Sequence, residues 1–252
     1  MAGFRGVSGF ARVVGVAALT RRKPPGLVDM KNYSGSLLFR PVGRDDAAGI
    51  AHVCYHTGYN GEDLEGGGRF DDRRLFALLF ALYYPVYEPE NAFVAVDADG
   101  RIAGYVLGTT DSRAQARRFR RRMIPRILLR ALAVSWWRYP ESFRALVHFG
   151  RVSAAHGAME DVFERYPAHL HINLLAGHQR GGAGPVLLDL FEARVRAAGI
   201  GGIHLSTSER NVKALPFYRK HGYALERILA PGLWPDAPEA RGLVFAKRLA
   251  GG

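Results

Sequence analysis

The sequence is poor in cysteine and in long apolar runs, and each scarcity excludes a class of protein. Cys54 is the one cysteine in 252 residues, so no intramolecular disulfide can form, and a reducing compartment such as the cytoplasm is favoured. No stretch reaches the roughly 18 uninterrupted apolar residues of a membrane-spanning helix. The short apolar run at 13–19 is bordered by basic residues and lacks a cleavage signal, which argues against a secretory signal peptide.

Acidic residues are scarce in two segments that carry most of the positive charge. Residues 112–151 contain eleven arginines against Glu141, and residues 1–31 contain six basic residues against Asp29, in a chain whose formal net charge is +12. A nucleic-acid-binding domain usually carries its basic surface on the folded module itself, so nucleic acid is an unfavoured partner. Contact of 112–151 with an anionic membrane surface is also unfavoured, although it stays open.

The chain has no Pro- or Ser-rich linker, which favours one domain with an insertion. Residues 1–35 are predicted to form a basic, flexible N-terminal tail, and residues 1–29 of it are expected to be dispensable for folding and turnover. A surface helix there, or a start codon placed upstream of a natural beginning at Met30, stays open. Residues 36–250 are predicted to form the single domain. Within it, residues 112–166 are expected to be a helical insertion.

Hydrophobic periodicity predicts alternating strands and helices in this domain. Strands are expected at 36–42, 169–175, 202–208 and in two last runs at 223–229 and 241–249, and helices at 45–58, 71–84, 185–198 and 211–220. Two alternating runs within 91–110 predict a hairpin about an Asp99-Gly100 turn. Aspartates should cap the first two helices, and Pro85 should end the second one.

The stretch HLHINLLAGHQRGGAGPVLLDL combines an alternating strand, a glycine cluster and a helix. On the strand, Leu170, Ile172 and Leu174 face one side, and His169, His171 and Asn173 face the other. Glycines admit a ligand close to the backbone, and a helix N-terminus offers unpaired N–H groups and the positive end of the helix dipole. These features predict a phosphate or pyrophosphate site, although a packing role for the glycines stays open.

The wider context of this loop resembles a known family. The chain resembles the GNAT superfamily of acyl-CoA-dependent N-acetyltransferases over nearly all of residues 36–249. The resemblance depends on the order of the elements and on three motifs: Q-x-x-G-x-G at Gln179–Gly184, N-x-x-A-x-x-F-Y at Asn211–Tyr218, and Gly222-Tyr223. The HLHI strand and the segment Thr57–Asp63 are also similar to acetyltransferase-like domains found with O-GlcNAcases. The resemblance implies an α/β fold whose mixed, mostly antiparallel sheet of six to seven strands is flanked by helices.

The resemblance also implies a site for acetyl-CoA, in a gap where the strand before the glycine loop splays from the next strand. Backbone amides around Leu174 and Leu175 would hold the pantetheine arm and polarise the thioester carbonyl. Gln179 would start the loop that holds the pyrophosphate. The loop amides concerned are those of Arg180, Gly182, Ala183 and Gly184.

Two positions depart from the family pattern. Ala176 stands where many members have proline, and Pro185 stands where many have a residue that can donate an N–H group. Pro185 suits the first position of a helix but removes one phosphate donor. Asn211 would orient the CoA arm, or it would cap the helix that follows.

The resemblance assigns the proton transfers to three side chains. Tyr218 matches the family tyrosine near the CoA sulfur and would act as general acid for the leaving thiolate. His171, with His169 in reserve, would accept the proton of the amine, because a similar H-x-H in some arylalkylamine N-acetyltransferases is interpreted as a proton path. The alternatives are two histidines satisfied within a sheet face and a partly buried structural tyrosine.

The predicted function is transfer of an acetyl group from acetyl-CoA to a primary amine, by direct attack through a tetrahedral intermediate and without a metal. The acceptor would be a small-molecule or peptide amine, and the protein a monomer or homodimer. A catalytically silent CoA-binding or interaction domain is the alternative. The acceptor side could be lined by His56, Tyr59, Glu62 and Asp63, and an arginine stripe of the insertion should lie beside it: Arg122, Arg126 and Arg130.

Overall fold

Seven strands form one mixed sheet in the computed structural model, which describes residues 37–155 and 159–249. Their order is β1-β2-β3-β4-β5-β7-β6, and each neighbouring pair is antiparallel except the parallel β4–β5 pair. The strands are β1 (Leu38–Pro41), β2 (Ala92–Val96), β3 (Ile102–Thr109), β4 (Ala168–Leu174), β5 (Gly202–Ser208), β6 (Ala224–Pro231) and β7 (Arg241–Arg248). The predicted mixed, mostly antiparallel sheet is confirmed.

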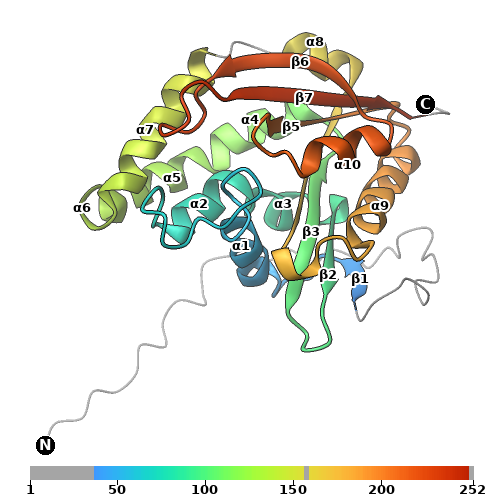
Figure 1. Ribbon diagram of the computed structural model, residues 1–252, viewed down its shortest axis with the longest axis horizontal. Helices are drawn as coiled ribbons and strands as arrows, with labels where there is room; N and C mark the ends of the chain where they lie inside the picture. Colours follow the sequence, from blue (N-terminus) through green and yellow to red (C-terminus); the bar gives the residue numbers. More distant parts are fainter. Residues whose placement is uncertain (1–36, 156–158, 250–252) are drawn as a thin grey trace, which may run out of the picture. The chain divides into compact units, whose positions relative to one another are not determined.

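Helices cover both faces of this sheet. Three helices precede the hairpin: α1 (Ala47–Tyr55), α2 (Arg73–Phe80) and α3 (Tyr83–Tyr87). They lie on one side of β2 and β3, and α9 (Ala183–Ala197) lies on the other, as Figure 1 shows. The helix α10 (Ala214–Lys220) follows β5. Short 3-10 turns at Pro89–Asn91 and Ala176–His178 precede β2 and the glycine loop. The flanking helices therefore complete the predicted α/β architecture.

The hairpin formed by β2 and β3 confirms the turn prediction. Gly100 has a φ of +78°, a value that glycine adopts without steric strain. The Asp97 carboxylate accepts hydrogen bonds from the backbone N–H groups of Asp99 at 3.0 Å and Arg101 at 2.8 Å. This side chain therefore fixes the turn from within it.

The predicted caps of the first two helices differ in outcome. Asp72 caps α2, since its carboxylate accepts from the Leu75 N–H group at 3.0 Å. Asp46 precedes α1 but does not cap it, because its carboxylate binds the Arg40 guanidinium at 2.6 Å instead. Pro85 does not end α2 but lies within α3, near the start of a helix, where its missing N–H group leaves no hydrogen bond unmade.

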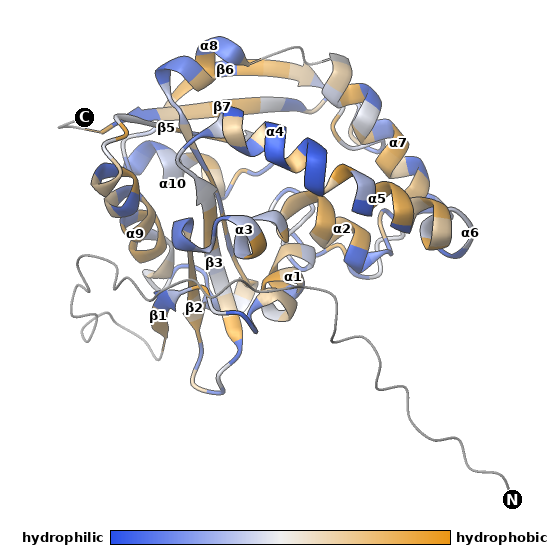
Figure 2. Ribbon diagram, turned by 180° about the vertical axis from the view of Figure 1, so that it is seen from behind, coloured by the Kyte–Doolittle hydropathy of each residue, from blue (hydrophilic) through white to orange (hydrophobic). Residues whose placement is uncertain are grey.

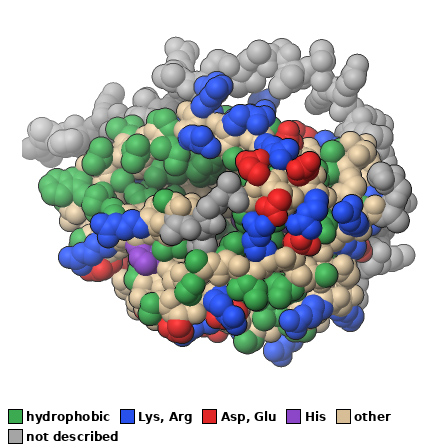
Figure 3. All heavy atoms as spheres, turned by 90° about the horizontal axis from the view of Figure 1, so that it is seen from above, with side chains coloured by type: hydrophobic (Ala, Val, Ile, Leu, Met, Phe, Trp, Pro, Cys, Tyr) green, Lys and Arg blue, Asp and Glu red, His purple; other side chains and the backbone are tan. Residues whose placement is uncertain are grey.

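The insertion is helical through most of its length. It contains α4 (Ser112–Arg122), α5 (Ile124–Arg130), a π turn (Ala131–Ser135), α6 (Trp136–Arg138), α7 (Pro140–Ala155) and α8 (Glu160–Arg165). Figure 2 shows a largely hydrophilic α4 running into α5 and α6, which carry more hydrophobic residues. Figure 3 shows hydrophobic side chains gathered at the end of the molecule where Figure 1 places α6.

The insertion is anchored to the domain by a buried carboxylate. Asp72, whose side chain is fully buried, accepts from Arg130 at 2.7 Å and from the Ser135 hydroxyl at 2.7 Å. Met123 and Ile127 pack into the main core beside it. The predicted arginine stripe therefore does not act as one unit: Arg130 is a structural ion pair, while the Arg126 guanidinium lies 5.7 Å from the centre of the Tyr87 ring.

The prediction of an N-terminal tail at 1–35 lies outside the described residues. All the described residues belong to one compact unit. Among the described residues, no helix has both the length and the apolar character needed to cross a bilayer.

Candidate active site

The site begins where β4 and β5 separate. Pairing between these strands covers Ala168↔Ile203 and His169↔His204. Beyond this point β4 stays paired with β3 as far as Leu174, and β5 stays paired with β7. A gap in the sheet follows, and it leaves backbone groups along one edge of β4 without a neighbouring strand.

The alternation of hydrogen bonds shows which amides face this gap. In an antiparallel pair, successive residues direct their backbone groups alternately toward and away from the partner strand. The Leu175 N–H group donates to the Ala103 carbonyl oxygen at 2.9 Å, so Leu174 directs its backbone groups away from β3 and into the gap. The expectation for Leu175 is therefore corrected, because its amide is already used within the sheet.

The glycine-rich loop turns its backbone toward the same gap. The Gln179 side-chain amide donates to the Leu174 carbonyl oxygen at 2.8 Å and ties the start of the loop to the end of β4. Arg180 and Gly182 have φ values of 64° and 87°. Such left-handed positions can bring successive N–H groups into one concave anion site, and here they stand at the start of α9.

Pro185 and Gly184 occupy the first turn of α9. The helix begins at Ala183, so Pro185 is its third residue and not the first one predicted. A Cβ atom on Gly184 would lie 3.2 Å from the Phe217 ring. Glycine at this position therefore allows α9 and α10 to approach closely at the mouth of the gap.

A cleft of about 590 Å³ occupies this place, between the glycine-rich loop, the end of β4 and α10. Arg180, Lys213 and Lys220 line it and make it positive. The two lysines were not singled out from the sequence. Their spacing of seven residues, which is two helical turns, was the available signal that they share one face.

A second cleft, of about 360 Å³, lies against α7 and the connection between β6 and β7. Phe149, Val152 and Trp234 give it an apolar wall, and Ser206 and Ser208 add hydroxyl groups. The two clefts meet at a shared set of residues: Thr57, Gly61, Ile172, Asn173, Asn211 and Tyr218. A molecule in one cleft can therefore contact a molecule in the other.

Tyr218 stands at this junction. Its side chain is 7% exposed, and its ring lies against those of Tyr223 and Phe245. Its hydroxyl has no hydrogen-bond partner in the described part of the chain. Burial raises the pKa of the phenol, so Tyr218 stays protonated at neutral pH and can donate a hydrogen bond into the junction.

His169 lines neither cleft, and both of its ring nitrogens are occupied. The Ser112 hydroxyl donates to the Pro167 carbonyl oxygen at 2.7 Å, so it must accept from His169 Nδ1, 2.8 Å away. His169 Nε2 then accepts from the Tyr84 hydroxyl at 2.8 Å. Burial, followed by the nearby histidines, holds the pKa of His169 well below its usual value.

His171 lines the second cleft. Its ring lies 5.5 Å from that of Tyr84 and 5.8 Å from that of His169, and within residues 37–155 and 159–249 it makes no hydrogen bond through its ring. Burial, and then His204, lower the pKa of His171 to about 4. The ring is therefore neutral near pH 7 and can accept a hydrogen bond.

Asn211 does not cap α10, whose N-cap is Lys213 without a side-chain cap. Its side-chain amide donates to the Thr207 hydroxyl at 3.4 Å. A Cβ atom on Gly61 would lie 2.9 Å from the Asn211 side-chain oxygen. The capping alternative is thus not observed, and Asn211 lies close to Gly61 in the loop after α1.

The loop after α1 contributes to the clefts through different residues from those expected. Thr57, Gly58, Asn60 and Gly61 line them, whereas His56, Tyr59, Glu62 and Asp63 line neither cleft. The Asn173 side-chain amide donates to the Thr57 hydroxyl at 2.5 Å, and that hydroxyl donates to the Val53 carbonyl oxygen at 2.7 Å. This chain of hydrogen bonds joins the end of α1 to β4.

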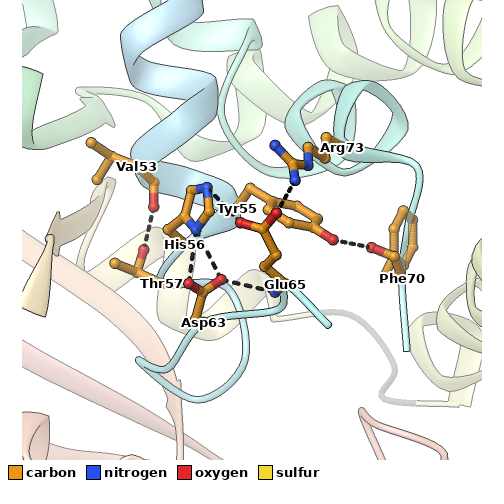
Figure 4. Close-up of polar contacts among 8 residues, drawn as sticks. All are labelled: Val53, Tyr55, His56, Thr57, Asp63, Glu65, Phe70 and Arg73. Atoms are coloured by element: carbon orange, nitrogen blue, oxygen red, sulfur yellow. Dashed lines mark hydrogen bonds and ion pairs between the residues drawn. The ribbon is translucent and has the colours of Figure 1, made fainter. Parts of the chain in front are cut away.

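Figure 4 shows the polar network on the outer side of this loop. His56 Nδ1 lies 2.8 Å from the Asp63 carboxylate, and Nε2 lies 3.6 Å from the Glu65 carboxylate. A histidine and two carboxylates are ligands that a divalent cation accepts. However, Arg73 already pairs with Glu65, and the two ring nitrogens face different carboxylates, so the network is satisfied without an ion.

The separated strands and the glycine-rich entry to α9 agree with the acyltransferase class that the sequence resemblance implies. The model of the acetyltransferase (GNAT) family matches residues 62–223. The chain belongs to this family of acetyltransferases.

Solved structures agree with this assignment. The protein named SsHAT shares 30% sequence identity with a TM-score of 0.67, over 85% of this chain and 98% of that one. An agmatine N-acetyltransferase, at 17% identity and a TM-score of 0.52, matches over 85% of this chain and 100% of that one. The NatC complex bound to Gag peptide and CoA contains a chain at 11% identity and a TM-score of 0.51, over 86% of this chain and 100% of that one. The last two show a shared fold.

Proposed function

We propose that the chain is an acetyl-CoA-dependent N-acetyltransferase that acts on a primary amine. The observation that carries the proposal is the meeting of two clefts at Tyr218 and Asn173, one positive and bordered by loop amides, the other without strong charge. A donor with phosphate groups suits the first, and an acceptor suits the second. The loop amides of Arg180, Gly182, Ala183 and Gly184 would hold the pyrophosphate, with Lys213 and Lys220 nearby.

The reaction requires one bond to form and one to break. The neutral amine attacks the thioester carbonyl carbon, a C–N bond forms, the C–S bond breaks, and the CoA thiolate leaves. The Leu174 amide, which faces the gap, would donate to the carbonyl oxygen as negative charge develops on it. Tyr218 would donate a hydrogen bond to the leaving sulfur.

His171 would receive the amine proton. With a pKa of about 4, it is too weak a base to deprotonate a free ammonium ion. The amine therefore has to enter in its neutral form, and it becomes acidic once the C–N bond forms. His171 would then accept that proton, directly or through water, while His169 keeps the ring environment fixed.

The second cleft also favours a class of acceptor. Of its lining residues, His171 and Tyr218 are the ones that titrate, and no described Asp or Glu lines it. A second cation on the acceptor would be buried without a partner there, which is unfavourable. We therefore propose a small-molecule or peptide acceptor with one amine and an uncharged body, held against Phe149 and Trp234.

A thiol-release assay with acetyl-CoA and paired amines tests both parts. Hexylamine and phenethylamine should be turned over, while 1,5-diaminopentane and agmatine should have kcat/KM values at least about tenfold lower. Higher values for the dications would refute the acceptor class. Binding of acetyl-CoA without thiol release from any amine would identify the silent CoA-binding alternative.

Some finer expectations stay proposals. The link to O-GlcNAcase-associated domains depends on the sequence resemblance at Thr57–Asp63 and in the HLHI strand. The domain bounds of 36–250 and a monomeric or homodimeric state are likewise proposed. Gel filtration of the full chain, with and without acetyl-CoA, tests the oligomeric state.

A further inference from the structure

An apolar ridge runs along the outer side of α5, the π turn and α6. It consists of Ile124, Leu128, Leu129, Leu132, Trp136 and Trp137, and we call it the α5–α6 ridge. Their exposed fractions range from 37% to 70%. The opposite side of the same helices, at Met123, Ile127 and Ala131, is buried in the core. The ridge is therefore a continuous helical face that the fold leaves uncovered by the described residues.

The ridge is too apolar to be an ordinary exposed surface. Monomeric proteins rarely expose a contiguous patch of large apolar side chains, and where they do it is often functional. Trp137 Nε1 donates to the Ala133 carbonyl oxygen at 3.0 Å, so the indole N–H group is satisfied within the helix. The exposed indole ring therefore needs no hydrogen bond from water, and burying it would leave no polar group unsatisfied.

Unpaired arginines border the ridge. Arg113, Arg118 and Arg130 each pair with a carboxylate. A second group of exposed arginines has no carboxylate within 4.0 Å among residues 37–155 and 159–249: Arg117, Arg120, Arg121, Arg122, Arg126 and Arg138. Figure 2 shows the hydrophilic α4 in blue beside α5 and α6, where hydrophobic and hydrophilic residues are mixed. The surface is thus apolar in one part and strongly positive in the adjoining part.

We propose that the α5–α6 ridge docks the protein on an anionic lipid bilayer. Tryptophan and leucine side chains on a helix lying in the plane of the interface bury their apolar parts among the acyl chains, and basic residues beside them contact the headgroups. A second copy of the chain fits less well, because an isologous contact would bring the same arginines together. The following helix, α7, contributes Phe149 and Val152 to the second cleft, so docking would hold that cleft near the membrane surface.

Flotation of the full chain with vesicles tests the proposal. One set is phosphatidylcholine alone, and the other is equal parts of phosphatidylcholine and phosphatidylglycerol. The variant Trp136→Ser/Trp137→Ser removes the ridge aromatics, with Leu38→Ser/Val212→Ser as the control because both residues are exposed apolar positions elsewhere. The anionic vesicles should bind the wild type and the control, and the ridge variant should bind at least about tenfold more weakly.

The contribution of charge is tested with Arg121→Gln/Arg122→Gln, and the control is Arg44→Gln/Arg101→Gln, because both of its arginines are exposed on loops away from α5 and α6. Each arginine near an anionic surface changes the partition coefficient by roughly fivefold, so the first variant should lose roughly 25-fold and the second little. The tryptophan fluorescence emission of the wild type should also shift to shorter wavelength with anionic vesicles, because Trp136 and Trp137 move from water into the bilayer interface.

Two results would overturn the proposal. Equal vesicle binding by the ridge variants and their controls would place any lipid contact elsewhere on the chain. A lipid-free dimer that Trp136→Ser/Trp137→Ser converts to monomer would assign the ridge to a second copy. Thermal melting of each variant checks that it is folded before its vesicle binding is compared. The arginine substitutions lie at exposed positions, so that variant should fold even if the tryptophan variant does not.

Discussion

Replacing Tyr218 with phenylalanine is the cleanest test of the proposed chemistry. The substitution removes one oxygen atom, and no described residue hydrogen-bonds to it. The ring contacts with Tyr223 and Phe245 remain. We therefore expect Tyr218→Phe to fold with an unchanged melting temperature and to bind acetyl-CoA as before.

The size of the catalytic effect follows from the acidity of the phenol. A thiol has a pKa of about 8.5. Burial raises the pKa of Tyr218 above its usual value of 10.0, so complete proton transfer to the thiolate is uphill. The hydroxyl then acts mainly as a hydrogen-bond donor to a developing charge, which contributes about 1.5–3 kcal/mol. At about 1.4 kcal/mol per tenfold change, kcat should fall roughly 10- to 150-fold.

Thiol release under single-turnover conditions measures this step without product release. Tyr223→Phe is the matched control, because its hydroxyl is also buried but donates to Glu192 at 3.2 Å, outside both clefts. That variant should lose about 1.5–3 kcal/mol of unfolding free energy, because the bond is to an ion-paired carboxylate, and should keep its kcat. A Tyr218→Phe enzyme within about threefold of wild type would refute the donor role.

Other predictions follow from the same geometry. Arg130→Gln should lower the unfolding free energy by about 2–3 kcal/mol in urea titrations, because it leaves the buried Asp72 carboxylate unpaired, whereas Arg122→Gln should change it by about 0.5 kcal/mol or less. Gly182→Ala should raise the acetyl-CoA KM, because a Cβ atom is strained at its φ of 87°. The unfolding free energy should fall from pH 6.5 toward pH 4, because His169, His171 and His204 have lowered pKa values and the unfolded chain binds protons that the folded chain does not. Urea titrations across that range measure the slope.

Much of the fold could be predicted because its signals are local. The hairpin depends on Asp97, Asp99 and Gly100 within four residues of one another, and the strand, glycine loop and α9 follow each other directly. Asp46 shows where local reasoning fails. Its position suits an N-cap, but Arg40, six residues earlier, lies close enough to bind its carboxylate. An ion pair of this kind depends on how β1 enters α1, which the sequence pattern does not show.

The second cleft could not be predicted for a related reason. Its apolar wall comes from α7 and from Trp234, which are far apart in the sequence and meet through tertiary packing. Phe149 and Trp234 rings lie 5.3 Å apart, yet each one alone looks like an ordinary core residue. The acidic and histidine side chains of the loop after α1, which were expected to line the acceptor side, line neither cleft.

The paired histidines of β4 show how tertiary contacts divide two residues that are equivalent in the sequence. His169 and His171 share a face and lie two residues apart, so either could have served as the base. Ser112 and Tyr84 decide between them, because they occupy both nitrogens of His169 from positions 57 and 85 residues away in the chain. His171 lies beside the second cleft, and no residue in the described part of the chain hydrogen-bonds to its ring nitrogens. The proposal of proton acceptance therefore falls to His171, because Ser112 and Tyr84 already use both ring nitrogens of His169.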